Sequence, residues 1–437
     1  MWAHARPRVA GWRRAIANVM SRPDFRRFWI GQSASEIGDR LVVVAVALFV
    51  TNHTGSATDV GLVLGAHAAP LVLFMLVGGV WADRLPRHLV VVATDLVRAA
   101  LHGLLAVLIL SGEIRIWQLI VIEAAFGTAE AFYRPARTAL IPQLVPEELI
   151  QDANAISGAS DQVAQLLGPA LATALIAGVG AGWAFALDAS TFLLSAALLS
   201  RVRPRRRAER SARRPFSTEL REGFAEVRSR SWVWVTIAVF SVALLAGLAP
   251  WYVLGPTLAR GHYGSTAVFG VVTIAFGVGA VAGALLGLRW RPERPMRAGF
   301  VACVAWPVSL AMLALGAPLI FLLPVTLLFG TGFALFLVWW ETALAERIPA
   351  AALSRVTSYD WVGSLALMPL GYIAAGPIAG AIGADAVLLS GAALTTLALG
   401  IGLLPRQTRC MTMPRARPDG GGGDAAASLP GHLPVGV

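Results

Sequence analysis

Long apolar stretches separated by short polar turns recur along the whole chain, and twelve of them approach the length of a membrane span. A helix needs about 20 apolar residues to cross a bilayer. Backbone groups in lipid must bond within their own segment, so each stretch is predicted to be helical. The predicted spans are 28–51, 60–82, 89–111, 116–138, 154–179, 182–200, 232–256, 266–288, 297–316, 318–344, 356–382 and 384–404. The pattern predicts an all-α integral membrane protein.

Arginine is distributed unevenly between the polar segments. Alternate turns such as 51–59 contain none, whereas arginine is frequent in the N-terminal segment 1–27, the turn 83–88, the segment 201–231, the turn 289–297 and the tail 405–437. Basic loops stay in the cytoplasm. We therefore expect a multi-pass protein of the cell inner or plasma membrane with both termini cytoplasmic. Within 201–231, the stretch STELREGFAEVRSR is predicted to be an amphipathic helix on the inner leaflet, and the tail is predicted to be disordered.

The two halves of the chain contain related segments. The motif FGT begins at Phe126 and again at Phe329, and a TAL triplet follows each copy. Both copies fall at the fourth predicted span of their half. Duplicated halves in parallel orientation are typical of transporters. This predicts two six-helix bundles, at 28–200 and 232–404, related by pseudo-symmetry.

Composition excludes several functional classes. Hydrophobic residues make up 57% of the chain and charged residues 14%, against roughly 25% charged in soluble domains. The formal net charge is +11, yet the chain contains no lysine, and a phosphate-binding P-loop requires one. Because the basic residues lie in membrane turns, we expect no nucleic-acid partner. The sequence predicts no ATP site, no metal site, no cofactor and no enzymatic activity.

The turn after the second span carries a dense charge cluster, GGVWADRLPRH at 78–88. It resembles the G-x-x-x-D-R-x-G-R-R signature of the major facilitator superfamily, which Gly79, Asp83, Arg84 and Arg87 match. Pro86 stands where glycine is usual. The stretches FRRFWIGQSASEIGDRL (25–41), TGSATDVGLVLGA (54–66) and TDLVRA (94–99) resemble exporters of the enterobactin and macrolide efflux type.

This resemblance implies a role for each matching residue. In the family the turn is a cytoplasmic gating latch, which assigns that role to Gly79, Asp83, Arg84 and Arg87. The second-half turn, GLRWRPERPMRAG, lacks the aspartate, so the latch is expected to be asymmetric. LLGPALAT in the fifth span resembles the family's antiporter motif, centred on Gly168 and Pro169. Ala172 and Thr173 replace its following glycines.

Charged residues also occur inside the first predicted span. Asp39 lies about eleven residues into it, near the middle of the membrane at 1.5 Å per residue. A carboxylate there is a candidate proton carrier, since burial favours the neutral acid. A permanent pair with Arg40 or another arginine would instead make Asp39 structural. Glu36 and Arg40, at i and i+4, are predicted to pair with each other, and Gln32 extends the same polar stripe.

The fourth span is the second source of candidates. Glu130 and Arg134 have the spacing of an ion pair, whereas Glu123 has no obvious partner. Glu123 is therefore the second candidate for proton coupling, or a substrate-binding residue.

The third span places Asp95, Arg98 and His102 on one face of a helix. We expect these to form a buried ion network with a structural role. Further candidates for the network are Asp161, Gln165 and Asp188.

The second half carries few buried charges. Glu341 follows two tryptophans, and Asp360 lies between Tyr359 and Trp361. These aromatics would suit a cationic ligand, but membrane-interface anchors are the favoured interpretation. Phe329, Phe333 and Phe336 are predicted to line a cavity for a bulky apolar substrate.

The resemblance implies a secondary transporter that exports a bulky, partly apolar small molecule such as a drug, macrolide or siderophore. Proton entry at an acidic residue is expected to drive it, with access alternating as one bundle rocks against the other. An importer, an uncoupled facilitator of the same fold, and a non-transporting membrane sensor or scaffold remain alternatives. The expected partners are the substrate and the lipid bilayer, and a monomer is favoured.

Overall fold

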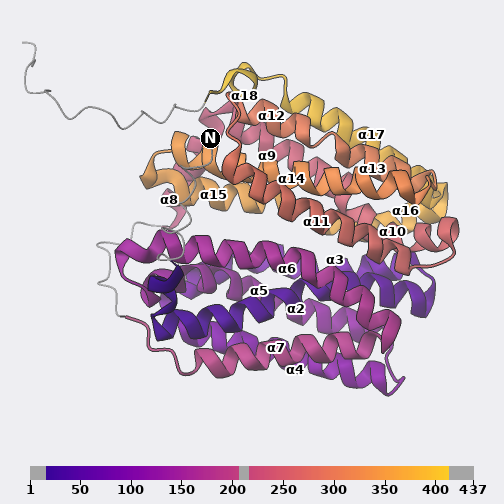
Figure 1. Cartoon of the computed structure of the whole chain (residues 1–437), viewed down its shortest axis with the longest axis horizontal. Coiled ribbons are helices and arrows are strands. Elements are labelled where there is room, and N and C mark those ends of the chain that lie inside the picture. The colour runs from indigo at the N-terminus through magenta and orange to yellow at the C-terminus, as the bar shows by residue number, and fades with distance from the viewer. Residues whose placement is uncertain (1–15, 206–215, 413–437) are drawn as a thin grey trace, which may run out of the picture.

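The computed structural model describes residues 16–205 and 216–412, where every regular element is a helix (Figure 1). The first half contains α2 (Pro23–Thr54), α3 (Ala57–Arg84), α4 (Arg87–Leu110), α5 (Ile116–Leu144), the 3-10 helix η1 (Glu147–Leu149), α6 (Ile150–Gly178) and α7 (Ala181–Leu199). The second half contains α8 (Phe216–Ser229), α9 (Ser231–Ala243), the π-helical turn η2 (Leu244–Leu248), α10 (Ala249–Tyr263), α11 (Ala267–Arg289), α12 (Pro295–Ala302), α13 (Ala305–Ala314), α14 (Leu319–Arg347), α15 (Ala350–Leu365), α16 (Met368–Ile382), α17 (Ala384–Gly402) and α18 (Arg406–Cys410).

One helix or several consecutive helices cover each predicted span, which confirms that these stretches are helical. Three of the spans are assembled from consecutive helices, at Ser231–Tyr263, Pro295–Ala314 and Arg355–Ile382. Within the described residues, nine helical segments are long and apolar enough to cross a membrane by length and composition. The other three predicted spans correspond to α2, α5 and α6, which carry several of the charged residues of the site described below.

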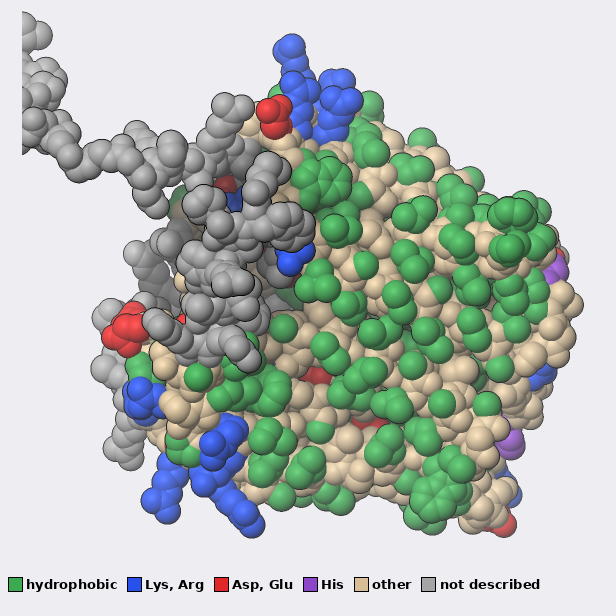
Figure 2. All heavy atoms as spheres, viewed as in Figure 1, with side chains coloured by type: hydrophobic (Ala, Val, Ile, Leu, Met, Phe, Trp, Pro, Cys, Tyr) green, Lys and Arg blue, Asp and Glu red, His purple; other side chains and the backbone are tan. Residues whose placement is uncertain are grey.

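The helices form two bundles, α2–α7 and α9–α17, which lie one above the other in Figure 1. Figure 2 shows apolar side chains spread over both, with arginines gathered near the end where α8 and α18 lie. Large apolar side chains such as Leu73 (71% exposed) and Ile320 (74% exposed) lie on the outer surface. An apolar exterior of this extent is expected of a protein surrounded by lipid.

The internal repeat predicted from the two FGT motifs is visible in the helix packing. In the first bundle α5 packs on α3, and a Cβ at Gly127 would lie 2.0 Å from the carbonyl oxygen of His67. In the second bundle α14 packs on α11, and a Cβ at Gly330 would lie 2.0 Å from the carbonyl oxygen of Phe276. Each motif therefore supplies a glycine at the same close helix contact of its bundle.

The core of the second bundle is aromatic. Trp306 stacks on Phe329 with ring centroids 5.3 Å apart, and Phe336 stacks on Phe240 at 4.3 Å. Phe329 and Phe336 are at most 2% exposed. The prediction that they line a substrate cavity is wrong for these two residues, because they pack against other aromatic rings within their own bundle.

The two tryptophans before Glu341 are also buried. Trp339 and Trp340 are each 3% exposed, and Trp340 donates a hydrogen bond of 2.8 Å to Asp360. Membrane-interface anchors lie at the lipid surface, so the anchor interpretation is wrong for Trp339 and Trp340. Trp361, in contrast, is 49% exposed.

The bundles contact each other near the end of α2 that contains Asn52. There α3 packs on α16, so closely that a Cβ at Gly61 would lie 2.2 Å from the Tyr372 carbonyl oxygen. α6 packs on α11 in the same way, with Gly270 against Thr173. Arg260 and Thr266 both donate hydrogen bonds to the Asn52 side chain, at 2.6 and 2.9 Å. The arginine distribution predicts this end to be extracellular.

The connection between the bundles includes a helix, as predicted for the STELREGFAEVRSR stretch. This helix, α8, packs against α15 rather than standing apart from the protein. Glu222 forms an ion pair of 2.8 Å with Arg355, and the ring of Phe224 lies 6.0 Å from that of Tyr359. Residues 1–15, 206–215 and 413–437 lie outside the described residues. The predicted disorder of 405–437 is wrong for its first part, where Arg406–Cys410 form α18, and is untested for the remainder.

Candidate functional site

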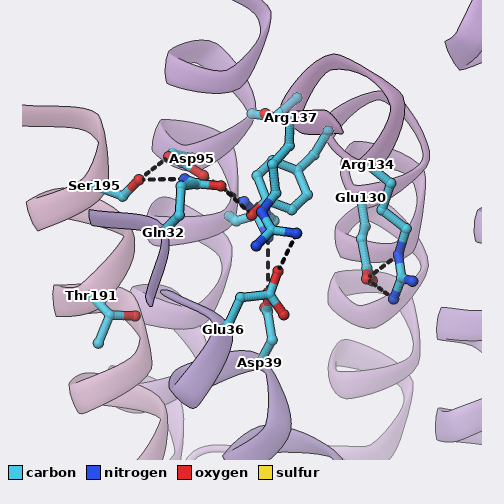
Figure 3. Close-up of polar contacts among 12 residues, drawn as sticks. Gln32, Glu36, Asp39, Asp95, Glu130, Arg134, Arg137, Thr191 and Ser195 are labelled. Carbon is cyan, nitrogen blue, oxygen red and sulfur yellow. Dashed lines mark hydrogen bonds and ion pairs between the residues drawn. The ribbon is translucent and has the colours of Figure 1, made fainter. Parts of the chain in front are cut away.

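The first bundle encloses a network of ionisable side chains from α2, α3, α4, α5 and α7, part of which is drawn in Figure 3. Its members lie in the interior of a membrane-spanning bundle, where an unpaired charge is strongly unfavourable. Their pairing therefore determines which of them is free to exchange a proton.

Arg98 of α4 is the centre of one part of this network. Its guanidinium contacts Asp95 at 2.5 Å and Asp39 of α2 at 3.3 Å. The same group lies 3.7 Å from the ring centroid of Tyr133 and 4.2 Å from that of Phe192, as in cation–π contacts. Arg98 and Asp95 are fully buried, so their charges stabilise each other away from water.

A chain of hydrogen bonds fixes the position of Asp95 (Figure 3). The Ser195 hydroxyl donates to Asp95 at 2.6 Å, and the Gln32 amide donates to Ser195 at 2.8 Å. Tyr133 in turn donates to the Gln32 side-chain oxygen at 2.5 Å. With both oxygens engaged, Asp95 is held rigidly, which supports the predicted structural role of the Asp95–Arg98 pair.

Asp39 is held less completely than Asp95. One of its oxygens contacts Arg98, while the other has no hydrogen-bond partner among the described residues. The side chain is 16% exposed. Asp39 is therefore paired with an arginine, as one of the two sequence interpretations expected, but the arginine is Arg98 and not its neighbour Arg40.

Two histidines form the second part of the network. His67 of α3 contacts Glu123 through Nδ1 and Glu130 through Nε2, both at 3.0 Å. His102 of α4 contacts Asp188 of α7 through Nδ1 at 2.5 Å and Glu123 through Nε2 at 3.5 Å. Glu123, which had no evident partner in the sequence, thus lies between two imidazole rings.

The third part contains the arginines of α5. Glu130 and Arg134 form the predicted pair, at 2.5 Å, and Arg134 is 40% exposed (Figure 3). Arg137 contacts Asp161 at 2.9 Å and Glu36 at 3.5 Å. The predicted pairing of Glu36 with Arg40 is therefore wrong, because Glu36 turns towards α5 instead.

Arg40 lies at the contact of α2 with α6. A Cβ at Gly168 would lie 2.4 Å from the Cβ of Arg40, so α6 approaches α2 closely at this glycine. Pro169 follows inside the helix. The Gly168–Pro169 motif is thus placed at a helix contact beside the polar stripe of α2.

The residues of the predicted latch lie at the end of α3 and the start of α4. Gly79, Asp83 and Arg84 belong to α3, but their side chains lie outside the described residues. Arg87 donates a hydrogen bond of 2.9 Å to the carbonyl oxygen of Ala139, which joins the turn to α5. The latch role stays a prediction for all four residues.

Sequence reasoning did not find His67. The sequence indicates this residue only as a single histidine within the otherwise apolar second predicted span. The carboxylates that it contacts lie 56 and 63 positions further on, so no local spacing connects them.

Two packed helical bundles with an apolar exterior and ion pairs buried in the interior define a multi-pass membrane transporter. The chain belongs to the Major Facilitator Superfamily, whose family model matches residues 28–363. It is a transporter and not an enzyme.

Comparison with known proteins gives relatives over nearly the whole chain. It is 25% identical to macrolide efflux protein A of Streptococcus pyogenes over 394 residues, which cover 86% of this chain and 94% of the relative. It is 26% identical to the multidrug efflux pump Tap of Mycolicibacterium fortuitum over 383 residues, 83% of this chain and 91% of that one. A crystal structure of a variant of the nucleoside transporter NupG superposes with a TM-score of 0.67 at 14% identity, covering 88% and 99% of the two chains.

Proposed function

We propose that this chain exports a bulky amphipathic small molecule, of the drug, macrolide or siderophore type, in exchange for protons that move inward. It acts in the plasma membrane with both termini in the cytoplasm. Two relatives that it matches over more than four-fifths of its length are named for macrolide and multidrug efflux. The distribution of arginine between the turns supports the orientation.

The chemistry of the two bundles supports an amphipathic substrate. The first bundle brings charged groups to its interior and partly to its surface, as at Asp39 and Arg134. The second bundle meets it through apolar and aromatic residues such as Ile373 and Tyr372. A molecule bound between the bundles would contact a charged wall and an apolar wall.

The observation that carries proton coupling is the half-satisfied state of Asp39. Arg98 is already neutralised in part by Asp95, so its single charge is shared between two carboxylates. One proton on Asp39 would bring the net charge of Arg98, Asp95 and Asp39 to zero. Protonation would release Asp39 from Arg98, and deprotonation would restore the pair, so the bundle has two electrostatic arrangements. Glu123 is the second candidate for the coupling residue.

Alternating access then follows from rocking of the two bundles about their contact. Proton binding from outside neutralises the acidic site and permits inward rotation. Release to the cytoplasm restores the charged state in which substrate binds. In this scheme Gly79, Asp83, Arg84 and Arg87 latch the cytoplasmic side, and the coupling uses neither ATP nor another cofactor.

Transport by purified protein in liposomes tests this function. Radiolabelled erythromycin and ethidium serve as probes, with an acidic lumen supplying outward proton flow. Wild type should accumulate at least one probe only while the gradient persists, and Asp39→Asn should not. Asp24→Asn on the same helix is the matched control, because Asp24 lies at the helix start and pairs locally with Arg27.

Two results would contradict the proposal. Accumulation that survives collapse of the pH gradient would exclude proton coupling, and failure of wild type to move either probe would contradict the drug and macrolide substrates of the proposal. Asp83→Asn should slow transport without abolishing the dependence on the gradient, because it alters the latch and not the proton site.

A further inference from the structure

Asp188, His102, Glu123, His67 and Glu130 form an unbroken series in which carboxylates alternate with imidazoles. The successive contacts measure 2.5, 3.5, 3.0 and 3.0 Å. The 3.5 Å approach of His102 Nε2 to Glu123 Oε1 is an ion-pair contact and not a hydrogen bond, so these two groups must move closer for a proton to pass between them. The series crosses four helices, from α7 through α4 and α5 to α3, and returns to α5. Imidazole binds a proton at one nitrogen and releases one from the other, so such an alternation is a suitable path for protons.

The members of this series differ sharply in exposure. Asp188 and His102 are completely buried and Glu123 is 2% exposed. His67 is 24% exposed, and Glu130 at the end of the series is 7% exposed. His67 therefore links the three sealed groups to the space outside the bundle core, and α3, which carries it, is a helix that faces the second bundle.

The charges of the series cannot balance without bound protons. Three carboxylates face one arginine, Arg134, which pairs with Glu130. Neutrality requires two additional positive charges, which only protons on the histidines or carboxylates can provide. Because a net buried charge is strongly unfavourable in the membrane, the series holds about two protons at rest and becomes charged when it loses one.

Among the described residues, Arg98 of α4 also acts on Asp188 and Glu130, but its charge is already shared by Asp95 and Asp39. Asp39 of α2 and Arg98 of α4 contact each other. Phe126 of α5 stacks on the His102 ring at 3.9 Å, and Phe185 of α7 contacts its edge. From the second bundle, Tyr372 of α16 is the titratable group at the contact with α3, and Tyr252 of α10 lies near Arg40.

We propose that His67 is the port of a proton store formed by Glu123, His102 and Asp188, and that protons enter and leave this store only through the His67 ring. The inference rests on the proposed function and develops its second coupling candidate, Glu123, by identifying the groups through which that carboxylate gains and loses its proton. This proposal differs from coupling through a single carboxylate, because it requires a titrating imidazole at position 67.

The transfer is balanced at each step. A proton taken up by His67 on Nε2 is matched by release of the Nδ1 proton to Glu123. The step starts from the state in which both rings are neutral and carry their proton on Nδ1. The Glu123 acid is formed at Oε2, so its carboxyl group must turn to present the proton to Nε2 of His102, which then releases its Nδ1 proton to Asp188. The same steps in reverse return one proton to the space between the bundles when His67 is exposed there.

A fixed ion bridge is the alternative role for His67, and two substitutions separate the roles. His67→Lys keeps a cation between Glu123 and Glu130, and His67→Gln keeps a neutral hydrogen-bonding group. Each variant is reconstituted and assayed for gradient-driven erythromycin accumulation. Each is also assayed for exchange of labelled against unlabelled erythromycin with no gradient, which requires alternating access without net proton movement.

Both variants should lose gradient-driven accumulation by about 100-fold or more, the lower end of the range for removal of a proton-transfer group, while exchange continues. His262→Lys is the matched control, because this histidine also contacts a carboxylate, Asp385 at 3.0 Å, but lies exposed in the second bundle. The control should keep both activities. Glu123→Gln should show the same split as the His67 variants, which provides an independent test if His67→Lys does not fold.

Accumulation by His67→Lys at the wild-type level would overturn the proposal, because a fixed cation would then be sufficient. Loss of exchange together with accumulation, in variants that remain monodisperse, would also overturn it, since the port is not needed for exchange. Both results leave the proposed function intact if wild type still shows gradient-driven transport. Absence of that transport in wild type would instead contradict the proposed function.

Discussion

Arg260 of α10 donates a hydrogen bond of 2.6 Å to the side-chain oxygen of Asn52 on α2, so one residue pair joins the two bundles at the predicted outer end. Thr266 donates to the same oxygen at 2.9 Å. Both residues of the pair are exposed, which reduces the strength of the contact.

Asn52→Ala should therefore destabilise the closed outer end by about 0.5–1.5 kcal/mol. Spin labels on the outer ends of α2 and α11 should show a larger population of long distances in this variant. Thr54→Ala is the control, because the recorded bonds of the Thr54 hydroxyl stay within the first bundle: it donates to the Val50 carbonyl oxygen and accepts from the Ser56 amide. Identical distance distributions for Asn52→Ala and wild type would show that helix packing alone closes this end.

Replacement of Arg98 should damage the fold and not only transport. Arg98→Ala leaves Asp39 and Asp95 without their shared cation, and breaking a buried ion pair costs about 3–5 kcal/mol. Arg98→Lys should also destabilise, because lysine lacks the planar fork that contacts both carboxylates and the Tyr133 ring. Thermal unfolding in detergent measures this, with the exposed Arg26→Lys as control. An unchanged melting temperature for Arg98→Ala would contradict the ion-network interpretation.

The two glycines of the repeated motif should respond alike to alanine. At Gly127 and at Gly330 a Cβ would lie 2.0 Å from a backbone oxygen of the neighbouring helix. Separation of the helices would be required in both bundles, so Gly127→Ala and Gly330→Ala should each lower the yield of monodisperse protein. Gly158→Ala in α6 is the control, since nothing lies within 4 Å of its added Cβ. Normal yields for both motif variants would show that the helix pairs tolerate a wider separation.

The two cysteines allow the predicted orientation to be measured. Cys410 is exposed, whereas Cys303 is fully buried. A membrane-impermeant maleimide should label Cys410 in inside-out vesicles and leave intact cells unlabelled. Cys410→Ser is the control that assigns the signal. Labelling of intact cells would place the C-terminal end outside and reverse the proposed topology.

The fold was predictable because lipid imposes one rule on every span. An uninterrupted apolar stretch with polar ends specifies a membrane helix directly, and the helix predicted at 266–288 or 384–404 needs no knowledge of its neighbours. The positions at which helices break within a predicted span were harder to predict from the sequence. The π-helical turn η2 at Leu244–Leu248 contains no proline or charge of its own, and its mark in the sequence is Pro250, two residues further on in α10.

The site was predictable only where pairing is local. Glu130 and Arg134 are one helical turn apart and pair as expected. Glu36 shows the limit, because Arg40 has equivalent spacing but Arg137, from another helix, is the actual partner. Which of two arginines a carboxylate contacts depends on how the helices rotate against each other, and no local pattern records that rotation.

The helices α2, α5 and α6 are not among the nine segments that are apolar enough to cross a membrane by composition. This affects how the chain is inserted into the membrane during synthesis. During synthesis each of them must enter the bilayer with carboxylates and arginines whose partners lie elsewhere in the chain. α2 is made first, yet Arg98, which contacts Asp39, is made about sixty residues later. The first bundle is therefore expected to insert as a unit, with α2 retained beside the insertion machinery until α4 arrives to neutralise it.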